Sequence, residues 1–121
     1  MRRNAVALAI AVAAAGAGGC RPDAAKVAGG DPARGVEAIG RYGCGACHAI
    51  PGVEGADAVI GPSLDHIASR TQLAGQIENS LANMMRWIQK PQEIRKDTLM
   101  PDMEVTDQDA RDIAAHLYTL K

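Results

Sequence analysis

The sequence of 121 residues contains no phenylalanine, one tryptophan and two tyrosines. Hydrophobic residues make up 47% of the chain, yet many of them are alanines, which bury little surface each. Since apolar burial contributes roughly 25 cal/mol per Å², such side chains provide a thin core for a domain of this size. The composition therefore hints that something bulky and apolar completes the core, without identifying it.

An excess of positive charge is also missing. The formal net charge of the whole chain is −1, and it becomes −3 when Arg2 and Arg3 are removed with the N-terminal signal described below. Proteins that bind nucleic acid present basic surfaces to the phosphates, so this mild acidity argues against nucleic acid as a partner. The length leaves room for one domain.

The N-terminal segment has the pattern of a secretory signal. Arg2 and Arg3 precede an apolar run over residues 5–15, and small residues follow it. The run is shorter than the roughly 20 residues that a transmembrane helix needs. We therefore expect residues 1–19 to be a signal peptide that is removed on export.

Cys20 follows Ala17-Gly18-Gly19, which resembles the end of a bacterial lipoprotein signal. The resemblance implies that Cys20 becomes the lipidated first residue, although Ala17 stands where such signals usually have leucine. The alternative is ordinary cleavage nearby, but exported proteins seldom leave a free thiol unused. We expect residues 20–30 to be a lipidated, flexible tether on the periplasmic or outer face of the cytoplasmic membrane, followed by one domain over 31–121.

Helix signals occur at several places in this domain. Asp31-Pro32 suits an N-cap and a first turn, and the helix is expected to extend to about residue 42. A short helix is expected over 63–70, and longer ones over 80–90 and 107–120, where apolar residues recur at three- and four-residue spacing. No stretch alternates as a strand does. The sequence predicts an all-α class with long loops.

The stretch CGACH, residues 44–48, has four plausible uses. A disulfide oxidoreductase needs a βαβ context, and a structural zinc site needs a further pair of ligands, neither of which is found in the sequence. A simple disulfide between Cys44 and Cys47 leaves His48 unexplained. The fourth use is covalent haem attachment, for which C-x-x-C-H is the signature. On a helical turn the three side chains point to one side, which suits this use best.

Several further stretches accompany this motif: ARGVEAIGRYGCGACH, IGPSLDHIASR, RWIQKPQEI, TLMPDM and VTDQDARDIAAHLYTL. Together they resemble class I monohaem c-type cytochromes from about residue 31 to residue 120. They are similar to the cytochrome c domain of some haem–copper oxidase subunits II, but we expect no copper-binding domain before them here. The resemblance implies three to five short helices wrapped around one covalently bound haem c.

Iron ligation follows from the motif and the resemblance together. His48 is expected to be the proximal ligand. Met84 and Met85 lie on one expected helix face and are interpreted as core, whereas Met100 and Met103 lie in an irregular stretch. The resemblance places the sixth ligand at the Met of Met-Pro, which is Met100, with Met103 as the alternative.

The same resemblance gives expected roles to Pro62 and His116, and the position of His66 in the sequence gives a third. The Pro62 carbonyl is expected to accept a hydrogen bond from the second nitrogen of His48, which orients the ring. His66 is interpreted as a surface residue, and His116 as a packing or surface residue rather than a ligand.

Two protein ligands on the iron leave no open position for a small-molecule substrate. The expected function is therefore outer-sphere electron transfer and not enzymatic catalysis, at a potential raised by His/Met ligation. The first hypothesis is a membrane-tethered carrier between a quinol-oxidising complex and a terminal oxidase. The alternatives are a haem c subunit of a larger oxidase or dehydrogenase complex, and a gas-sensing or catalytic haem protein with a labile Met.

Overall fold

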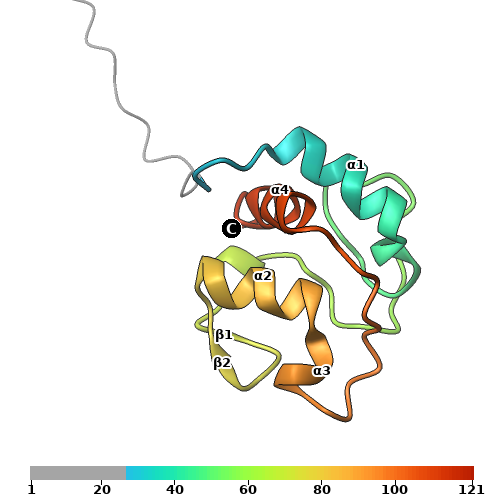
Figure 1. Ribbon diagram of the computed structural model, residues 1–121. Helices are drawn as coiled ribbons and strands as arrows, with labels where there is room; N and C mark the ends of the chain where they lie inside the picture. The colour runs from blue at the N-terminus through green and yellow to red at the C-terminus, as the bar shows by residue number, and fades with distance from the viewer. Residues whose placement is uncertain (1–26) are drawn as a thin grey trace, which may run out of the picture.

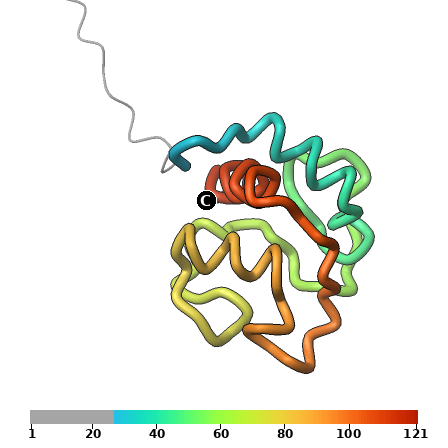
Figure 2. Tube along the Cα trace, viewed as in Figure 1, coloured from blue at the N-terminus to red at the C-terminus, as the bar shows by residue number. Residues whose placement is uncertain are grey.

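The computed structural model describes residues 27–121 of the chain. The expected signal peptide, Cys20 and most of the expected tether lie outside these residues. Four α-helices dominate the described part: α1 (Pro32–Tyr42), α2 (Leu81–Gln89), α3 (Pro91–Ile94) and α4 (Asp107–Leu117). Helix α4 lies between α1 and α2, so that elements far apart in the sequence form one frame (Figures 1 and 2). The predicted all-α class is confirmed.

The helices begin where the capping residues of the sequence predict. The Asp31 carboxylate accepts hydrogen bonds from the first backbone N–H groups of α1, and Gly43 ends that helix in the left-handed region, with φ 71°. The Ser80 and Thr106 hydroxyls accept from the backbone of Asn83 and Asp109 at the starts of α2 and α4. Helix α4 ends at Leu117, three residues earlier than expected.

Two short elements differ from the sequence prediction. The helix expected over 63–70 is only a 3₁₀ turn, η2 (Ile67–Ser69). Beyond it, β1 (Gln72–Leu73) pairs antiparallel with β2 (Ile77–Glu78), and positive φ angles at Ala74 and Gly75 reverse the chain between them. Strands of two residues are too short to show the alternation by which strands are recognised, so the sequence could not reveal them.

Close contact between α1 and α4 depends on Gly35. A Cβ atom at this position would overlap the backbone carbonyl of Asp112 on α4. Small residues around the crossing, Ala38, Ala110 and Ala114, are fully buried. The alanine-rich composition therefore allows two helix backbones to approach each other closely.

A buried carboxylate joins the same two helices. Asp112 is 1% exposed. It accepts hydrogen bonds from the Asp31 backbone at 2.8 Å and from the Arg34 Nε at 2.9 Å. The hydrogen bond from Arg34 is the main reason that the pKa of Asp112 lies below its ordinary value. The ionised carboxylate thus ties the start of α1 to the middle of α4.

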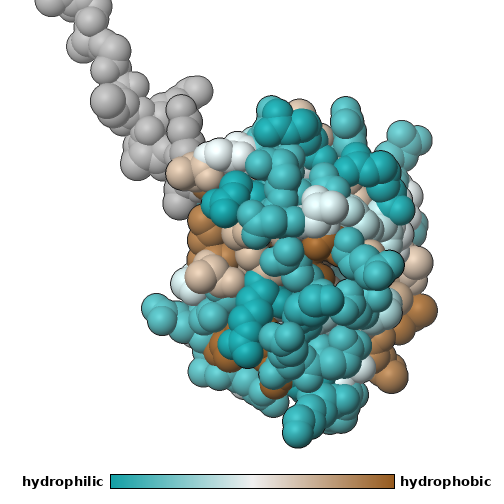
Figure 3. Space-filling model, in the orientation of Figure 1, coloured by the Kyte–Doolittle hydropathy of each residue, from teal (hydrophilic) through white to brown (hydrophobic). Residues whose placement is uncertain are grey.

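The remaining core lies on the other side of α4, where buried aliphatic and sulfur-containing side chains gather. Met84 and Met85, predicted to be core residues, are both buried. The face in Figure 3 is mainly hydrophilic, with apolar side chains in patches near its edges. Within residues 27–121, no helix has both the length and the apolar character that crossing a bilayer requires.

Substitution of two glycines of α1 tests the close helix crossing. Gly35→Ala should lower the free energy of unfolding by about 1–3 kcal/mol, as overpacking does in well-packed cores. Gly40→Ala, in the same helix but with no atom within 4 Å of the added carbon, should raise it by about 0.5–1 kcal/mol because alanine favours the helix. Chemical denaturation followed by circular dichroism measures both. Equal effects of the two substitutions would contradict the packing argument.

Candidate haem site

A deep cleft opens between α2, the β-hairpin and the loop before α4. It has a volume of about 910 Å³ and continues into a smaller inner cavity of about 120 Å³. The inner cavity is lined mostly by apolar core residues, among them Ile39, Ile50, Leu73, Met84 and Ile113. Clefts of a few hundred to about 1,000 Å³ with apolar walls and a few polar groups are typical ligand sites.

The CGACH motif forms one wall of this cleft. Residues 44–46 make a 3₁₀ turn, η1 (Cys44–Ala46), directly after the left-handed Gly43. The backbone N–H groups of Cys47 and His48 both donate to the Cys44 carbonyl, at 3.2 and 3.1 Å. Neither Cys44 nor Cys47 is in a disulfide, and both line the cleft together with His48. The turn therefore places all three side chains of the motif at one cavity.

The orientation of His48 is fixed from two sides. Its Nδ1 lies 2.7 Å from the Pro62 carbonyl oxygen. A carbonyl can only accept, so Nδ1 carries the hydrogen, and in the neutral form of the ring the lone pair is on Nε2. Gly61 packs on the ring: a Cβ atom there would lie 2.6 Å from the His48 Cε1. The arrangement leaves Nε2 available to bind a metal.

Met100 and Met103 also line the cleft and its inner cavity. The backbone around Met100 is held by two hydrogen bonds, from the Gln92 side chain to its carbonyl at 2.7 Å and from its N–H to the Thr98 hydroxyl at 3.2 Å. Further along the loop, Lys90 bridges to Asp102 at 2.7 Å. Met103 packs against the apolar core cluster, and Met100 is held mainly by its backbone.

The other two histidines lie away from this cleft. His66 is exposed and next to Asp65. His116 is buried, with its Nε2 2.9 Å from the Pro51 carbonyl oxygen, as expected for a packing residue. Among residues 27–121, no group of three or more His, Cys, Asp or Glu side chains gathers as a metal site.

Several cleft residues carry no signal in the sequence. Ile60 and Leu99 are exposed at the mouth, and Arg70 and Arg95 are the charged side chains that line it. Nothing in the spacing indicates that Ile60, Arg70 and the loop with Arg95 and Leu99 meet, because these are three separate parts of the chain. Only the folded arrangement brings them to the CGACH turn.

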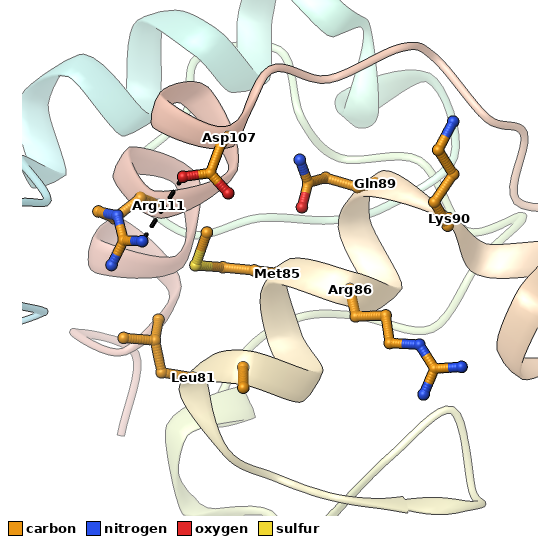
Figure 4. A pocket seen from close by; sticks show the side chains of 8 residues that line it. Leu81, Met85, Arg86, Gln89, Lys90, Asp107 and Arg111 are labelled. Atoms are coloured by element: carbon orange, nitrogen blue, oxygen red, sulfur yellow. Dashed lines mark ion pairs between the residues drawn. The ribbon is translucent and has the colours of Figure 1, made fainter.

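A second groove lies between α2 and α4 (Figure 4). It has a volume of about 600 Å³ and includes Leu81, Met85, Arg86 and Arg111 among its lining residues. Arg111 pairs with Asp107 across its edge, as the dashed line in Figure 4 marks. None of the predicted site residues lines this groove, so it is separate from the cleft that the motif forms.

Comparison with known proteins identifies the family. The family model described as "Cytochrome c" matches residues 32–121, nearly the whole described part of the chain. The chain belongs to the cytochrome c family. As a cytochrome c it binds haem c covalently and is an electron carrier rather than an enzyme, and Cys44 and Cys47 occupy the matching CxxCH positions.

A curated protein and a solved structure are similar to this cytochrome. The chain is 32% identical over 79 residues to cytochrome c oxidase subunit 2 of Alkalihalophilus pseudofirmus, a match that covers 64% of this chain and 22% of that protein. The cytochrome thus spans about a fifth of the length of this curated relative. A crystal structure of cytochrome c2 from Rhodobacter sphaeroides resembles it in fold, with a TM-score of 0.51 and 22% identity over 75% of this chain and 96% of that one.

The residues around the cleft fit haem c. Two thiols, one imidazole with a free Nε2 and a thioether sulfur face a cavity whose inner walls are apolar. A large apolar macrocycle in this place also accounts for the shortage of aromatic side chains in the core. Burial raises the pKa of the Cys44 thiol, as expected for a sulfur on an apolar wall.

Proposed function

We propose that this cytochrome is a one-electron carrier in a respiratory chain, with iron bound by His48 Nε2 and Met100 and with haem joined to Cys44 and Cys47. The observation that carries the proposal is the convergence of these four side chains on one largely apolar cleft. When bound, the haem supplies the ferric/ferrous couple. The protein's part is to hold both ligands so that they move little when the oxidation state changes.

The surroundings of the two methionines favour Met100 as the second ligand. Met103 is part of the packing against the apolar core cluster, so binding a metal would remove it from these contacts. Met100 is anchored through its backbone by Gln92 and Thr98, and its side chain contributes to the cleft wall without that packing role. With Met100 as the second ligand, the reduction potential would be higher than with two imidazole ligands.

The mouth of the cleft supports exchange of electrons with a protein partner. Leu99 and Ile60, which are 91% and 74% exposed, both line it, and the neighbouring Val59 is 89% exposed. Exposed apolar residues gathered at one place mark interaction sites. A patch of this small extent suits a transient encounter better than a permanent subunit interface, which is larger and more hydrophobic.

A terminal oxidase is the partner we propose. The relative named cytochrome c oxidase subunit 2 has a segment similar to this chain, which supports a place next to such an oxidase. A quinol-oxidising complex would supply the electrons. The alternative is that the chain is a haem c subunit of a larger oxidase or dehydrogenase complex. We also propose that the protein is exported and that lipid on Cys20 attaches it to the membrane.

Replacement of the two cleft methionines tests the ligand assignment. Ferric Met100→Ala should lose the sulfur-to-iron charge-transfer absorption band, and its reduced form should bind carbon monoxide rapidly because a coordination position is open. Met103→Ala, the matched control, should keep the band. Absorption spectra of both purified variants measure this. A band that survives in Met100→Ala would refute Met100 as ligand, and rapid carbon monoxide binding by the unmodified protein would favour a gas-binding function instead.

Negative charge introduced at the mouth of the cleft tests whether a partner protein binds there. Leu99→Asp and Ile60→Asp should each lower the kcat/KM for oxidation by oxidase-containing membranes about tenfold, which corresponds to about 1.4 kcal/mol. Ala33→Asp, which adds the same charge at an exposed position of α1 outside the cleft, should have little effect. The rate is followed as oxygen uptake. Equal rates for all three variants would place docking elsewhere.

A further inference from the structure

Residues 27–30, directly before α1, form a short strap that packs on helix α4. The Val27 side chain is buried, and the Gly30 N–H donates to the Val27 carbonyl at 2.9 Å. The Gln108 side chain of α4 donates to the Gly29 carbonyl at 2.9 Å. Burial of an apolar side chain and hydrogen bonds therefore both hold the strap in place.

The strap also passes very close to the backbone of α4. A Cβ atom added at Gly30 would lie 2.9 Å from the Arg111 carbonyl oxygen and 3.0 Å from the Ala115 Cβ. The Arg111 guanidinium donates in addition to the Ala28 carbonyl at 3.4 Å. These four residues thus pack as part of the folded domain, although they continue directly from the N-terminal segment.

The strap and the haem cleft lie on opposite faces of α4. The contacts to the strap come from Gln108, Arg111 and Ala115. The inner cavity of the cleft is lined by Ile113 and Leu117 of the same helix. With 3.6 residues per turn, the two groups lie roughly 120–180° apart around the helix axis. Helix α4 therefore stands between the strap and the haem cavity.

Helix α1 increases this separation. The strap leads into the N-terminal end of α1, whereas Cys44 follows shortly after its C-terminal end. A helix rises 1.5 Å per residue, so the 11 residues of α1 place about 16 Å between these two points. Figure 1 shows the strap in blue at the upper left and the orange loop between α3 and α4 at the lower right. The chain enters the domain on the side away from the cleft mouth.

The length of chain between Cys20 and the strap limits how the domain can turn. A chain spans at most about 3.6 Å per residue, so the seven residues 20–26 reach about 25 Å at most. A domain of this size is roughly 30 Å across. With the strap released, the eleven residues 20–30 could span about 40 Å. Docking of the strap therefore decides whether the chain before the domain is longer or shorter than the domain itself.

We propose that the strap keeps the mouth of the haem cleft turned away from the membrane. This inference rests on the lipid on Cys20 that belongs to the proposed function. For the mouth to face the lipid, the strap side would have to rise by the whole thickness of the domain, which residues 20–26 cannot span. The redox partner must therefore present its docking surface on a part that projects from the membrane, and a site level with the lipid headgroups is out of reach.

Spin labels on the full-length lipidated protein measure which side faces the membrane. A nitroxide is attached at Ala33→Cys, an exposed position beside the strap, or at Val59→Cys, an exposed position beside the cleft mouth. The reduced protein is bound to phosphatidylcholine vesicles that contain a nickel-chelating lipid, whose metal accelerates the relaxation of nearby nitroxides. We expect an acceleration several times larger at position 33 than at position 59.

Two variants lengthen the chain between the lipid and the domain. Insertion of about ten Gly and Ser residues between Lys26 and Val27 adds up to about 35 Å, and Gly30→Ala displaces the strap from α4. Both should increase the relaxation rate of the label beside the cleft mouth. The same insertion after Lys121, and Gly40→Ala at a position with open space, are the matched controls and should leave this rate unchanged.

Equal acceleration at the two labelled positions of the otherwise unmodified chain would overturn the proposal. So would a label at the cleft mouth that does not respond to the insertion before the strap. Flotation of the vesicles first establishes that the protein is attached to lipid. Protein that does not float with the vesicles lacks the anchor, which overturns the proposed membrane attachment itself and is thereby distinguished from failure of the strap.

Discussion

The hydrogen bond from His48 Nδ1 to the Pro62 carbonyl is the interaction on which the proposed site depends. It joins the CGACH turn to the loop that follows, and it fixes the imidazole tautomer so that Nε2 can bind a metal. Two backbone hydrogen bonds support the same junction, from Gly61 to the Cys47 carbonyl at 2.7 Å and from Leu64 to the Ala49 carbonyl at 2.9 Å. A side chain at position 61 would overlap the imidazole, so Gly61 provides the space that this ring orientation needs. The protein alone thus holds the His48 ring in the orientation that metal binding requires.

The helices provide the rigid frame around this junction. Gly35 lets α1 and α4 approach closely, and the Asp112 carboxylate with Arg34 secures the crossing. The turn that carries the cysteines follows directly from the left-handed end of α1 at Gly43, so the position of the thiols is set by the helix crossing. On the opposite side, Gln92 and Thr98 hold the backbone of the Met100 loop. One wall of the cleft therefore depends on helix packing and the other on hydrogen bonds to a loop.

Capping residues explain why much of this fold could be predicted from the sequence. Asp31, Ser80 and Thr106 act locally, so the starts of the three longer helices follow from a few neighbouring residues. The hairpin at 72–78 could not be predicted because its strands are two residues long. The meeting of Ile60, Arg70 and Arg95 at the cleft could not be predicted either, because these residues come from separate loops. The CGACH motif can be recognised in the sequence because covalent attachment of the cofactor fixes the spacing of its residues. Other residues around the cofactor can lie anywhere in the sequence, provided that the fold brings them together.

The central claim is that the cleft holds a haem bound covalently through Cys44 and Cys47. The most direct measurement is mass spectrometry of the protein expressed in an exporting host that attaches haem c, after denaturation and washing with acidified acetone. The account predicts that the pigment stays with the protein and that the peptide containing residues 44–48 gains the mass of one haem. Pigment that passes into the solvent, leaving a colourless chain with two unmodified thiols in that peptide, would contradict it.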